Sequence, residues 1–508
     1  MKKYYDYYIG LTPDKVFKGL VKDGLFSDQL PPIFQSNDFF GFVTTTLDLS
    51  FAEKPTIPVS YLSTRNTNIP RALSIPNPFS YYNLSNEIST SWTEICSHMN
   101  TKTASNTHKI SRIHIRSINK SDAIFKMNYK NYRTDDSAES DLLVGSRYIV
   151  KADISTCFPS IYTHSIPWAF VGKDIAKQNK NNRSLYYNKL DRLVTLTKEN
   201  ETHGILIGPH SSNIISEIVL TSVDYILYLK NYKFVRYIDD YRCYCKNIEE
   251  AEVFLVDLEN ALKEYGLLLN HKKTNVLKLP IGIDDEWTKE IKLLEVHIQD
   301  KKLNYRNVEG YFDLLISLSK KNNYDMSIVN YGLKALCDKR RFNSITDSAR
   351  KLLINLVSHT TIIYPYLIRN IEEFIFIFLS MTSDEIREIV QQILDATKNR
   401  ANYEIIAYCY YFSLKYSFAL DLGSDMFSYA KDSNDTVVLL MMYLYNKKNG
   451  LPIKDFSDYA KYIHKIDPIS CDKHWVFVYE VLKQVDLKND WKLIKTSNVS
   501  FLKSEYRY

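Results

Sequence analysis

The chain of 508 residues is 45% hydrophobic and 24% charged, with a formal net charge of +6 at pH 7. This composition is that of a soluble globular protein, the length suggests about two to four domains, and the small positive charge permits nucleic-acid binding without requiring it. The seven cysteines have neither disulfide nor zinc-site spacing, which argues against both kinds of framework and favours a reducing compartment.

No apolar run reaches the roughly 18 residues that a membrane span needs. The longest candidate, residues 374–379, is expected to be part of a core helix. Residues 1–8 lack the apolar stretch of a signal peptide. We therefore expect a cytoplasmic protein that does not enter a membrane.

The N-terminal third is predicted to combine helices with one basic strand. Thr12 caps a helix that ends near Gly24, and residues 76–100 have a helical pattern. Residues 101–147 are rich in basic side chains, and alternation within residues 110–116 predicts a strand with one apolar and one cationic face. That cationic face is either simply solvated or a surface that binds phosphates.

Acidic residues stand at the ends of predicted strands. Residues 148–153 favour a strand that ends in Asp153, and residues 233–245 form two aromatic and β-branched runs around Asp239 and Asp240. A hairpin turn forms more easily with Asn-Gly or Asp-Gly, so two adjacent carboxylates at this turn suggest a bound cation. An ordinary surface turn is the alternative.

The interval of 86 residues between Asp153 and Asp239 leaves room for helical crossovers that would lay the first strand beside the hairpin. We therefore predict that the three carboxylates converge on two divalent ions. Magnesium is expected, because it takes hard oxygen ligands and keeps positions open for phosphate, and manganese would also fit.

Two further segments surround the hairpin in the sequence. A glycine-containing turn at residues 204–213 leads into a helix with an apolar stripe, and it lacks the Gly-Lys-Ser/Thr of a Walker loop, so kinase and ATPase functions lose their main support. A later helix over residues 248–264 stops at Gly266, and the strand after it leads to Lys273. This lysine is either an ordinary surface residue or part of the site.

From about residue 290 onward the pattern changes to successive apolar helices with short polar turns between them. Helices of this length joined by short links predict αα-hairpins that stack as a solenoid. The expected helices cover residues 310–320, 346–358, 361–380, 383–397, 401–420, 435–447 and 473–485.

These motifs resemble those of reverse transcriptases, and among them the abortive-infection (Abi) reverse transcriptases of the AbiK and prophage P2 type. Asp153 with Phe158 is similar to polymerase motif A, and residues 237–240 are similar to the Tyr-x-Asp-Asp of motif C. Residues 204–213 resemble motif B, with Leu206 where a proline is usual. Further similar segments are motif D at 266–274, N-terminal segments at 30–34 and 71–78, and two segments of the Abi group at 162–168 and 201–205.

The resemblance, which spans about residues 20–280, implies an α+β chain in which reverse-transcriptase fingers and palm are followed by an all-α helical-repeat (HEAT-like) C-terminal domain. Fingers and palm are expected within residues 1–290, with the fingers at about 40–147 and the palm at about 148–290. The helical domain is expected over residues 291–508, in place of the usual thumb.

The resemblance also implies roles for single residues. Asp153, Asp239 and Asp240 would be catalytic and would hold two Mg²⁺ ions together with the backbone carbonyl of Ile154. Phe158 would fill the space that a ribose 2′-hydroxyl needs and so favour deoxynucleotides. The expected nucleotide-binding residues are Arg112, Arg116, Phe158, Gly208 and Lys273.

By the same resemblance the protein would polymerise dNTPs without a template, primed by one of its own tyrosines, so that single-stranded DNA stays covalently attached. It would act as a homo-oligomer in antiphage defence. Tyr8 is the first expected priming residue and Tyr4, Tyr5 and Tyr7 are alternatives, because this end of the chain is expected to be mobile. Two alternatives stay open: a conventional RNA-templated reverse transcriptase, and a non-catalytic nucleic-acid-binding scaffold with a relic palm.

Overall fold

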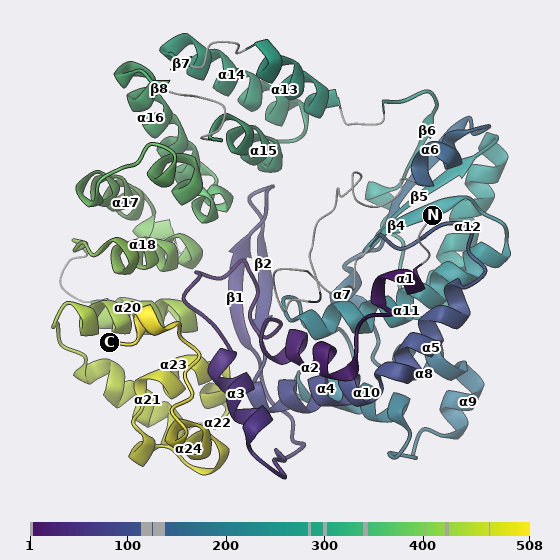
Figure 1. Cartoon of the computed structure of the whole chain (residues 1–508), viewed down its shortest axis with the longest axis horizontal. Helices are drawn as coiled ribbons and strands as arrows, with labels where there is room; N and C mark the ends of the chain where they lie inside the picture. The colour runs from purple at the N-terminus through teal and green to yellow at the C-terminus, as the bar shows by residue number, and fades with distance from the viewer. Residues whose placement is uncertain are drawn as a thin grey trace.

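The computed structural model describes residues 4–112, 124, 138–282, 286–297, 302–338, 344–400, 402–421, 426–466 and 468–508. Its N-terminal half contains a four-stranded sheet among helices, and its C-terminal half is a run of helices. In Figure 1 the sheet lies at one side and the later helices form an arc at the other, with the β1–β2 hairpin between them. The expected α+β class is confirmed.

The four-stranded sheet has the order β4-β5-β3-β6 and is antiparallel throughout. Its strands are β3 (Tyr148–Asp153), β4 (Phe234–Tyr237), β5 (Asp240–Cys245) and β6 (Asn275–Lys278). The predicted strand and hairpin are therefore present, and β3 lies directly against the second strand of the hairpin. α11 (His210–Leu229) and α12 (Ile248–Glu264) pack against each other, and α12 also contacts β3 and β5.

The predicted cap at Thr12 is confirmed, because its side chain accepts a hydrogen bond from the backbone N–H of Lys15. Of the predicted strand at residues 110–116, Ser111 forms a parallel bridge to Arg236, and residues 113–116 lie outside the described ranges.

The other elements of this half are β1 (Val59–Thr64), β2 (Pro70–Ile75), α1 (Tyr5–Tyr8), α2 (Pro13–Val21), α3 (Asn37–Thr45), α4 (Pro78–Thr90), α5 (Trp92–Thr103), α6 (Ala138–Leu143), α7 (Cys157–Ser160), α8 (Ser165–Val171), α9 (Lys173–Gln178), α10 (Tyr186–Leu196) and the 3₁₀ helix η1 (His271–Lys273).

The C-terminal half consists of helices that pack on their neighbours along the chain, for instance α17 on α18 and α18 on α20. Its helices are α13 (Glu286–His297), α14 (Tyr305–Lys321), α15 (Met326–Leu336), α16 (Asp347–Ile363), α17 (Ser383–Thr397), α18 (Tyr403–Tyr416), α19 (Met426–Ser433), α20 (Thr436–Lys448), α21 (Lys454–Ile466), α22 (Pro468–Lys473), α23 (Trp475–Val481) and α24 (Asn489–Thr496). Two short strands, β7 (Lys302–Leu303) and β8 (Ser344–Ile345), pair in parallel.

The single helix predicted over residues 361–380 is wrong. α16 ends at Ile363, a 3₁₀ helix covers Pro365–Arg369, and a π-helix covers Glu372–Ile377. Pro365 explains the break, because proline lacks the backbone N–H that would continue an α-helix and its ring clashes with the preceding turn.

Arg369, at the end of that 3₁₀ helix, joins the two halves of the chain. Its Nε donates to Glu404 Oε1 of α18 at 2.8 Å, and its Nη2 donates to Ser63 Oγ and to the carbonyl of Thr64 in β1, both at 2.6 Å. The other oxygen of Glu404 accepts from the backbone N–H of Thr64 at 2.7 Å. We call this set the junction network.

The hydrophobic core also crosses between the halves. One cluster of buried residues combines side chains from Val21 to Tyr81 with side chains from Ile291 to Tyr506. A second cluster fills the space around the four-stranded sheet, α5, α11 and α12. Residues 21–81 therefore share their interior with the C-terminal helices, whereas buried side chains between Tyr4 and Leu20 belong to the interior around the sheet.

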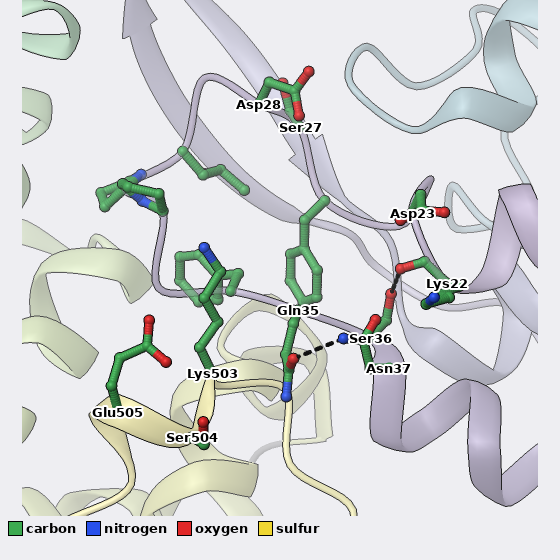
Figure 2. A pocket seen from close by; sticks show the side chains of 15 residues that line it. Lys22, Asp23, Ser27, Asp28, Gln35, Ser36, Asn37, Lys503, Ser504 and Glu505 are labelled. Atoms are coloured by element: carbon green, nitrogen blue, oxygen red, sulfur yellow. Dashed lines mark hydrogen bonds between the residues drawn. The ribbon is translucent and has the colours of Figure 1, made fainter. Parts of the chain in front are cut away.

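Residues 33–35 pair with residues 501–503, two segments that are far apart in the sequence. The backbone N–H of Gln35 donates to the carbonyl of Phe501, and that of Lys503 donates to the carbonyl of Ile33, each at 2.8 Å. A cavity of about 510 Å³ lies beside this pairing. It is lined by side chains from residues 22–37 and 503–505 (Figure 2). Its lining carries charges of both signs and contains none of the predicted site residues.

Within the described residues, α11 is the helix whose length and apolar composition would allow it to cross a membrane. However, 78% of its apolar window is buried inside the molecule, where it packs on α5, α8 and α12. Its apolar character is thus accounted for by the protein core.

Candidate active site

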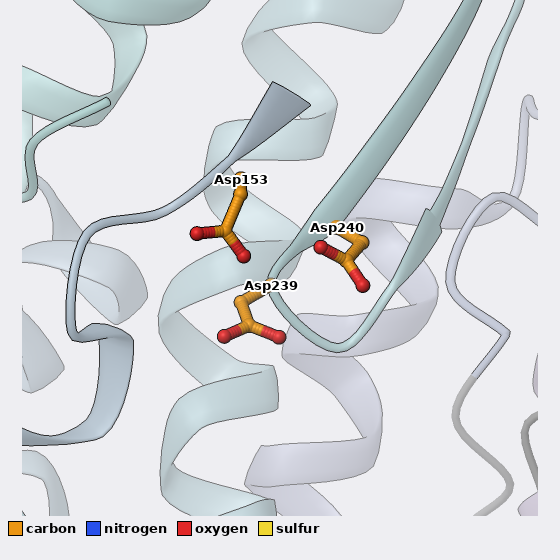
Figure 3. A group of neighbouring side chains, drawn as sticks. All are labelled: Asp153, Asp239 and Asp240. Carbon is orange, nitrogen blue, oxygen red and sulfur yellow. The ribbon is translucent and has the colours of Figure 1, made fainter. Parts of the chain in front are cut away.

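Three carboxylates from two separate segments meet at one end of the four-stranded sheet. Asp153 ends β3, Asp240 begins β5, and the two are directly opposite each other in the antiparallel pairing. Asp239 lies in the turn before Asp240, and ligand oxygens of all three residues lie within 4.8 Å of one another. Figure 3 shows the three side chains gathered between the end of β3 and the hairpin turn. The predicted convergence of the carboxylates is present.

The turn has a fixed backbone. Tyr237 pairs with Asp240, so Ile238 and Asp239 form its tip. Ile238 has φ of 60°, which places a β-branched residue in the left-handed region. The backbone N–H of Ile154 donates to the carbonyl of Asp239 at 3.1 Å and ties the turn to the residue that follows β3.

The electrostatics of the cluster favour a bound cation. Burial, together with the neighbouring Asp239 and Asp153 carboxylates, raises the pKa of Asp240 to about 7. Burial and Asp153 also raise the pKa of Asp239, against the opposing charges of Lys273 and Arg71. Asp153 is buried, Asp239 is half-buried and Asp240 is exposed. Like charges at this spacing are costly unless a cation offsets them. Three hard oxygen donors suit Mg²⁺ or Mn²⁺, so the residues present fit the predicted ions.

The segment after α12 brings two residues with nitrogen donors, Asn270 and Lys273, to Asp153. Asn270 Nδ2 donates to Asp153 Oδ2 at 2.8 Å, and its backbone N–H donates to the Asp153 carbonyl at 2.7 Å. Lys273 Nζ lies 3.3 Å from Asp153 Oδ2, and its side chain is 63% exposed. Lys273 is thus at the cluster, as one of the two sequence interpretations held. Asn270 was not predicted, although it lies only three positions before Lys273.

Arg71 was also missed as a site residue. It lies in β2, and its charge is the smallest of the effects on the pKa of Asp239, which it lowers, so a cation of the β1–β2 hairpin lies within electrostatic range of that carboxylate. In the sequence, residues 71–78 indicate only a segment similar to the Abi group, because the interaction joins parts of the chain that are far apart in sequence.

Of the two predicted arginines of the basic strand, the structure describes Arg112. The backbone N–H of Arg112 donates to the carbonyl of Arg236 at 2.7 Å, beside β4. Its charge, with burial as the larger cause, lowers the pKa of His108, and the effects that shift the pKa values of Asp239 and Asp240 do not include it. Arg116 lies outside the described residues.

Phe158 and Gly208 belong to two segments that are joined by a backbone hydrogen bond. Phe158, 9% exposed, lies in α7 directly after β3, and its carbonyl accepts from the backbone N–H of Ile205 at 2.9 Å. Gly208 has φ of 125°, and a Cβ there would lie 3.2 Å from the carbonyl oxygen of Ser74 in β2. The backbone N–H of Ser74 donates to the carbonyl of Ile207. Glycine is therefore required by both the backbone conformation and the close approach of β2.

The expectation that Tyr4 to Tyr8 form a mobile end is wrong. These residues lead into and form α1, Tyr4 is 4% and Tyr8 is 1% exposed, and both pack in the core around the sheet. Tyr5 and Tyr7 are half-buried. The aromatic rings explain the docking, because each buries a large apolar area. Which tyrosine primes, if any, stays a prediction.

Comparison with known proteins agrees with this geometry. Residues 97–298 match the family model described as reverse transcriptase (RNA-dependent DNA polymerase). A search of the curated proteins finds no match. The matched residues contain all three carboxylates, Lys273 and Asn270.

Similar solved structures include apo telomerase from Candida tropicalis truncated from its C-terminal domain (14% identity, 49% of this chain and 55% of that one, TM-score 0.28). They also include apo telomerase from Candida tropicalis (11%, 84% and 74%, TM-score 0.33) and telomerase from Candida albicans in complex with a fragment of telomeric RNA (13%, 69% and 63%, TM-score 0.26). The chain thus spans about half the length of the first of these. TM-scores this low carry no argument about function. The family match and the carboxylate geometry together identify a polymerase domain of reverse-transcriptase type.

Proposed function

We propose that this domain is an active, metal-dependent DNA polymerase that extends a chain without a template and uses a protein tyrosine as primer. The observation that carries the polymerase assignment is the meeting of Asp153, Asp239 and Asp240 within 4.8 Å. The untemplated, protein-primed chemistry and a role in abortive-infection defence are supported by the resemblance of residues 162–168 and 201–205 to the Abi group.

The reaction is a nucleotidyl transfer. A hydroxyl oxygen attacks the α-phosphorus of a dNTP, a new P–O bond forms, the bond to the β-phosphate oxygen breaks, and pyrophosphate leaves. Bound Mg²⁺ would lower the pKa of the attacking hydroxyl and offset the charge of the triphosphate. Asp153, Asp239 and Asp240 would hold the ions, with the Ile154 carbonyl as a further ligand.

Other residues of the chain would bind and orient the nucleotide. Lys273 and Arg71 supply positive charge beside the carboxylates, where triphosphate and leaving pyrophosphate need it. Arg112, Arg116 and Gly208 remain proposed nucleotide contacts. Phe158 would exclude a ribose 2′-hydroxyl and so select dNTPs.

The first nucleotide would be attached to one of Tyr4, Tyr5, Tyr7 and Tyr8. Tyr5 and Tyr7 are half-buried, whereas Tyr4 and Tyr8 are buried, so priming by Tyr8 requires α1 to leave the core. We further propose that the C-terminal helices form HEAT-like repeats and support a homo-oligomer in the cytoplasm.

The test is to incubate the purified protein with Mg²⁺ and labelled dNTPs, without nucleic acid. Label that stays with the protein after denaturation and is released by protease would support protein-primed synthesis. Asp239→Asn should abolish the incorporation. Incorporation that persists in this variant would contradict the assignment of the carboxylates.

A conventional RNA-templated reverse transcriptase is the second candidate, favoured by the description of the matching family as an RNA-dependent DNA polymerase. In that case synthesis would need an added RNA template and primer, and the product would not remain on denatured protein. A scaffold with a relic palm would incorporate no nucleotide under either condition.

A further inference from the structure

The catalytic turn holds an unfavourable conformation that needs support. Ile238 adopts φ of 60°, which residues with a branched Cβ rarely do. It sits directly before Asp239 and Asp240, so any relaxation of its backbone would move both carboxylates. Such conformations persist when the surrounding structure over-determines them.

Arg236 supplies that support from beneath the turn. Its Nη1 donates to the carbonyl oxygen of Ile238 at 2.8 Å, and its side chain is fully buried. The guanidinium is held in turn by two carboxylates of α11. Nε and Nη2 contact Asp224 at 2.7 to 2.9 Å, and Nη1 and Nη2 contact Glu217 at 3.2 and 3.3 Å. A planar fork with this many bonds fixes the direction of its remaining N–H groups.

This cluster contains two carboxylates and one guanidinium, so a negative charge remains in the interior unless further donors solvate it. Two tyrosine hydroxyls do so. Tyr241 OH donates to Asp224 Oδ1 at 3.1 Å, and Tyr4 OH donates to Glu217 Oε1 at 2.5 Å. Tyr241 is the residue next to Asp240 in the same hairpin, whereas Tyr4 comes from a segment 213 positions away from Glu217 in the sequence.

The docking of α1 places Tyr4 in this position. The rings of Tyr4 and Tyr8 lie 5.5 Å apart, edge to face, within the same buried cluster as the catalytic hairpin. Lys109 Nζ lies 3.9 Å from the ring centroid of Tyr7 and 5.5 Å from that of Tyr4. Tyr4 therefore reaches Glu217 through the interior and not by a surface contact.

We propose that Tyr4 and Arg236 are positioning residues for the metal site. Through Glu217, the Tyr4 hydroxyl completes the network that lets Arg236 hold the Ile238 carbonyl, and the docked α1 thereby sets the placement of Asp239 and Asp240 for divalent cations. The inference rests on the proposed function, because it assumes that these carboxylates bind metal.

The experiment measures Mn²⁺ binding directly, by calorimetry or by the electron paramagnetic resonance of free Mn²⁺, on the full-length protein without nucleotide. Tyr4→Phe removes one hydroxyl and keeps the ring. Its dissociation constant for Mn²⁺ should be about threefold to tenfold higher than that of the unmodified protein, because only part of the free energy of one charge-assisted hydrogen bond is transmitted to the metal site. Arg236→Lys, which keeps the charge and loses the fork, should weaken binding at least as much.

Tyr410→Phe is the matched control. Tyr410 is buried in α18, and its hydroxyl has no hydrogen-bond partner among the residues that the structure describes. The substitution therefore removes a buried hydroxyl without touching the network, and Mn²⁺ affinity should not change. An equal loss of affinity in Tyr410→Phe would mean that the Tyr4 effect is a general loss of packing, which overturns the inference.

Asp239→Asn separates failure of the inference from failure of the proposed function. If the unmodified protein and Asp239→Asn bind Mn²⁺ equally, the carboxylates are not a metal site and the proposed function fails. If Asp239→Asn loses binding and Tyr4→Phe does not, only the positioning role is wrong.

Extension of an added DNA primer distinguishes positioning from priming by Tyr4. Positioning predicts that Tyr4→Phe needs severalfold more Mg²⁺ for half-maximal extension. If Tyr4→Phe loses only the protein-attached product, while Mn²⁺ affinity and extension of the added primer match those of the unmodified protein, Tyr4 is the primer and has no positioning role.

Discussion

Two arginines, the buried Arg236 under the catalytic turn and the half-buried Arg369 in the junction network, make the same kind of interaction for two purposes. Each pairs with a buried glutamate from a helix and donates to a backbone carbonyl, that of Ile238 in one case and that of Thr64 in the other. The first carbonyl belongs to a strained turn between carboxylates, and the second to a regular β-strand. The comparison indicates that buried charge shapes the site in one half and joins the halves in the other.

The largest expected effect is on catalysis and leaves stability intact. Asp239→Asn should lower nucleotide incorporation on the order of 1000-fold, because bound metal supplies several kcal/mol of transition-state stabilisation. The same change should leave the melting temperature equal or higher, since it removes a half-buried carboxylate whose pKa is raised by desolvation and by Asp153. Activity assays and thermal unfolding on the same preparation check both parts. A large fall in melting temperature would mean that Asp239 is structural.

Arg369→Met should show the opposite behaviour. Breaking a buried pair leaves Glu404 uncompensated and should cost about 3–5 kcal/mol of stability, measured by denaturant unfolding. Arg192→Met is the control, because Arg192 pairs with Glu53 at the surface, where both side chains are about one-third exposed. That pair should contribute less than about 1 kcal/mol. Equal losses in the two variants would show that the junction network has no special role.

Asp435 tests whether a buried charge in the helical half contributes to stability. It caps α20 by accepting from the N–H groups of Val437 and Val438, and burial raises its pKa from 3.8 to about 6. A raised folded-state pKa means that the folded protein loses stability as pH rises from about 4 to 6, by roughly 3 kcal/mol at most.

Asp435→Asn keeps an oxygen for the cap and does not titrate. The stability of the unmodified protein should therefore fall relative to this variant between pH 4.5 and 7, as followed by thermal unfolding at several pH values. Parallel pH profiles would contradict the assignment.

The smallest expected effect concerns Arg71, which belongs to the β1–β2 hairpin that links both halves. Arg71→Ala should raise the KM for dNTP about tenfold with a smaller change in kcat, because the variant loses one charge-assisted contact to phosphate. Arg65→Ala, an exposed arginine at the same hairpin, should change neither. A fall in kcat alone would place Arg71 away from the bound nucleotide.

Local pattern was enough to predict the strand that ends at Asp153, the hairpin around Asp239 and Asp240, and the cap at Thr12. Each depends on neighbours within a few residues, where alternation, turn chemistry and capping act. The spacing also sufficed to predict that the carboxylates meet. Pro365 indicates a break in the helix, but the apolar residues on both sides of it favour one continuous helix, and this explains the wrong prediction.

Contacts between distant segments were beyond the reach of the sequence. The electrostatic effect of Arg71 on Asp239 and the hydrogen bond from Tyr4 to Glu217 depend on the tertiary fold. The sequence around Arg71 and Tyr4 contains no pattern that predicts these interactions. The prediction of a mobile N-terminus failed for the same reason, since aromatic residues at an end of the chain are equally suited to a core that the sequence does not reveal. Asn270 is easier to predict as a site residue, because it lies on the segment that leads to Lys273.

The pairing of residues 33–35 with residues 501–503 has a consequence for how the protein is made. During translation, the segment around Ile33 leaves the ribosome long before its partners around Phe501 exist, and the apolar side chains between Val21 and Tyr81 must wait for helices encoded far downstream. Synthesis of a shortened chain would leave that early segment exposed to chaperones and proteases. A truncated product would thus lack the partners that bury this segment in the full-length protein.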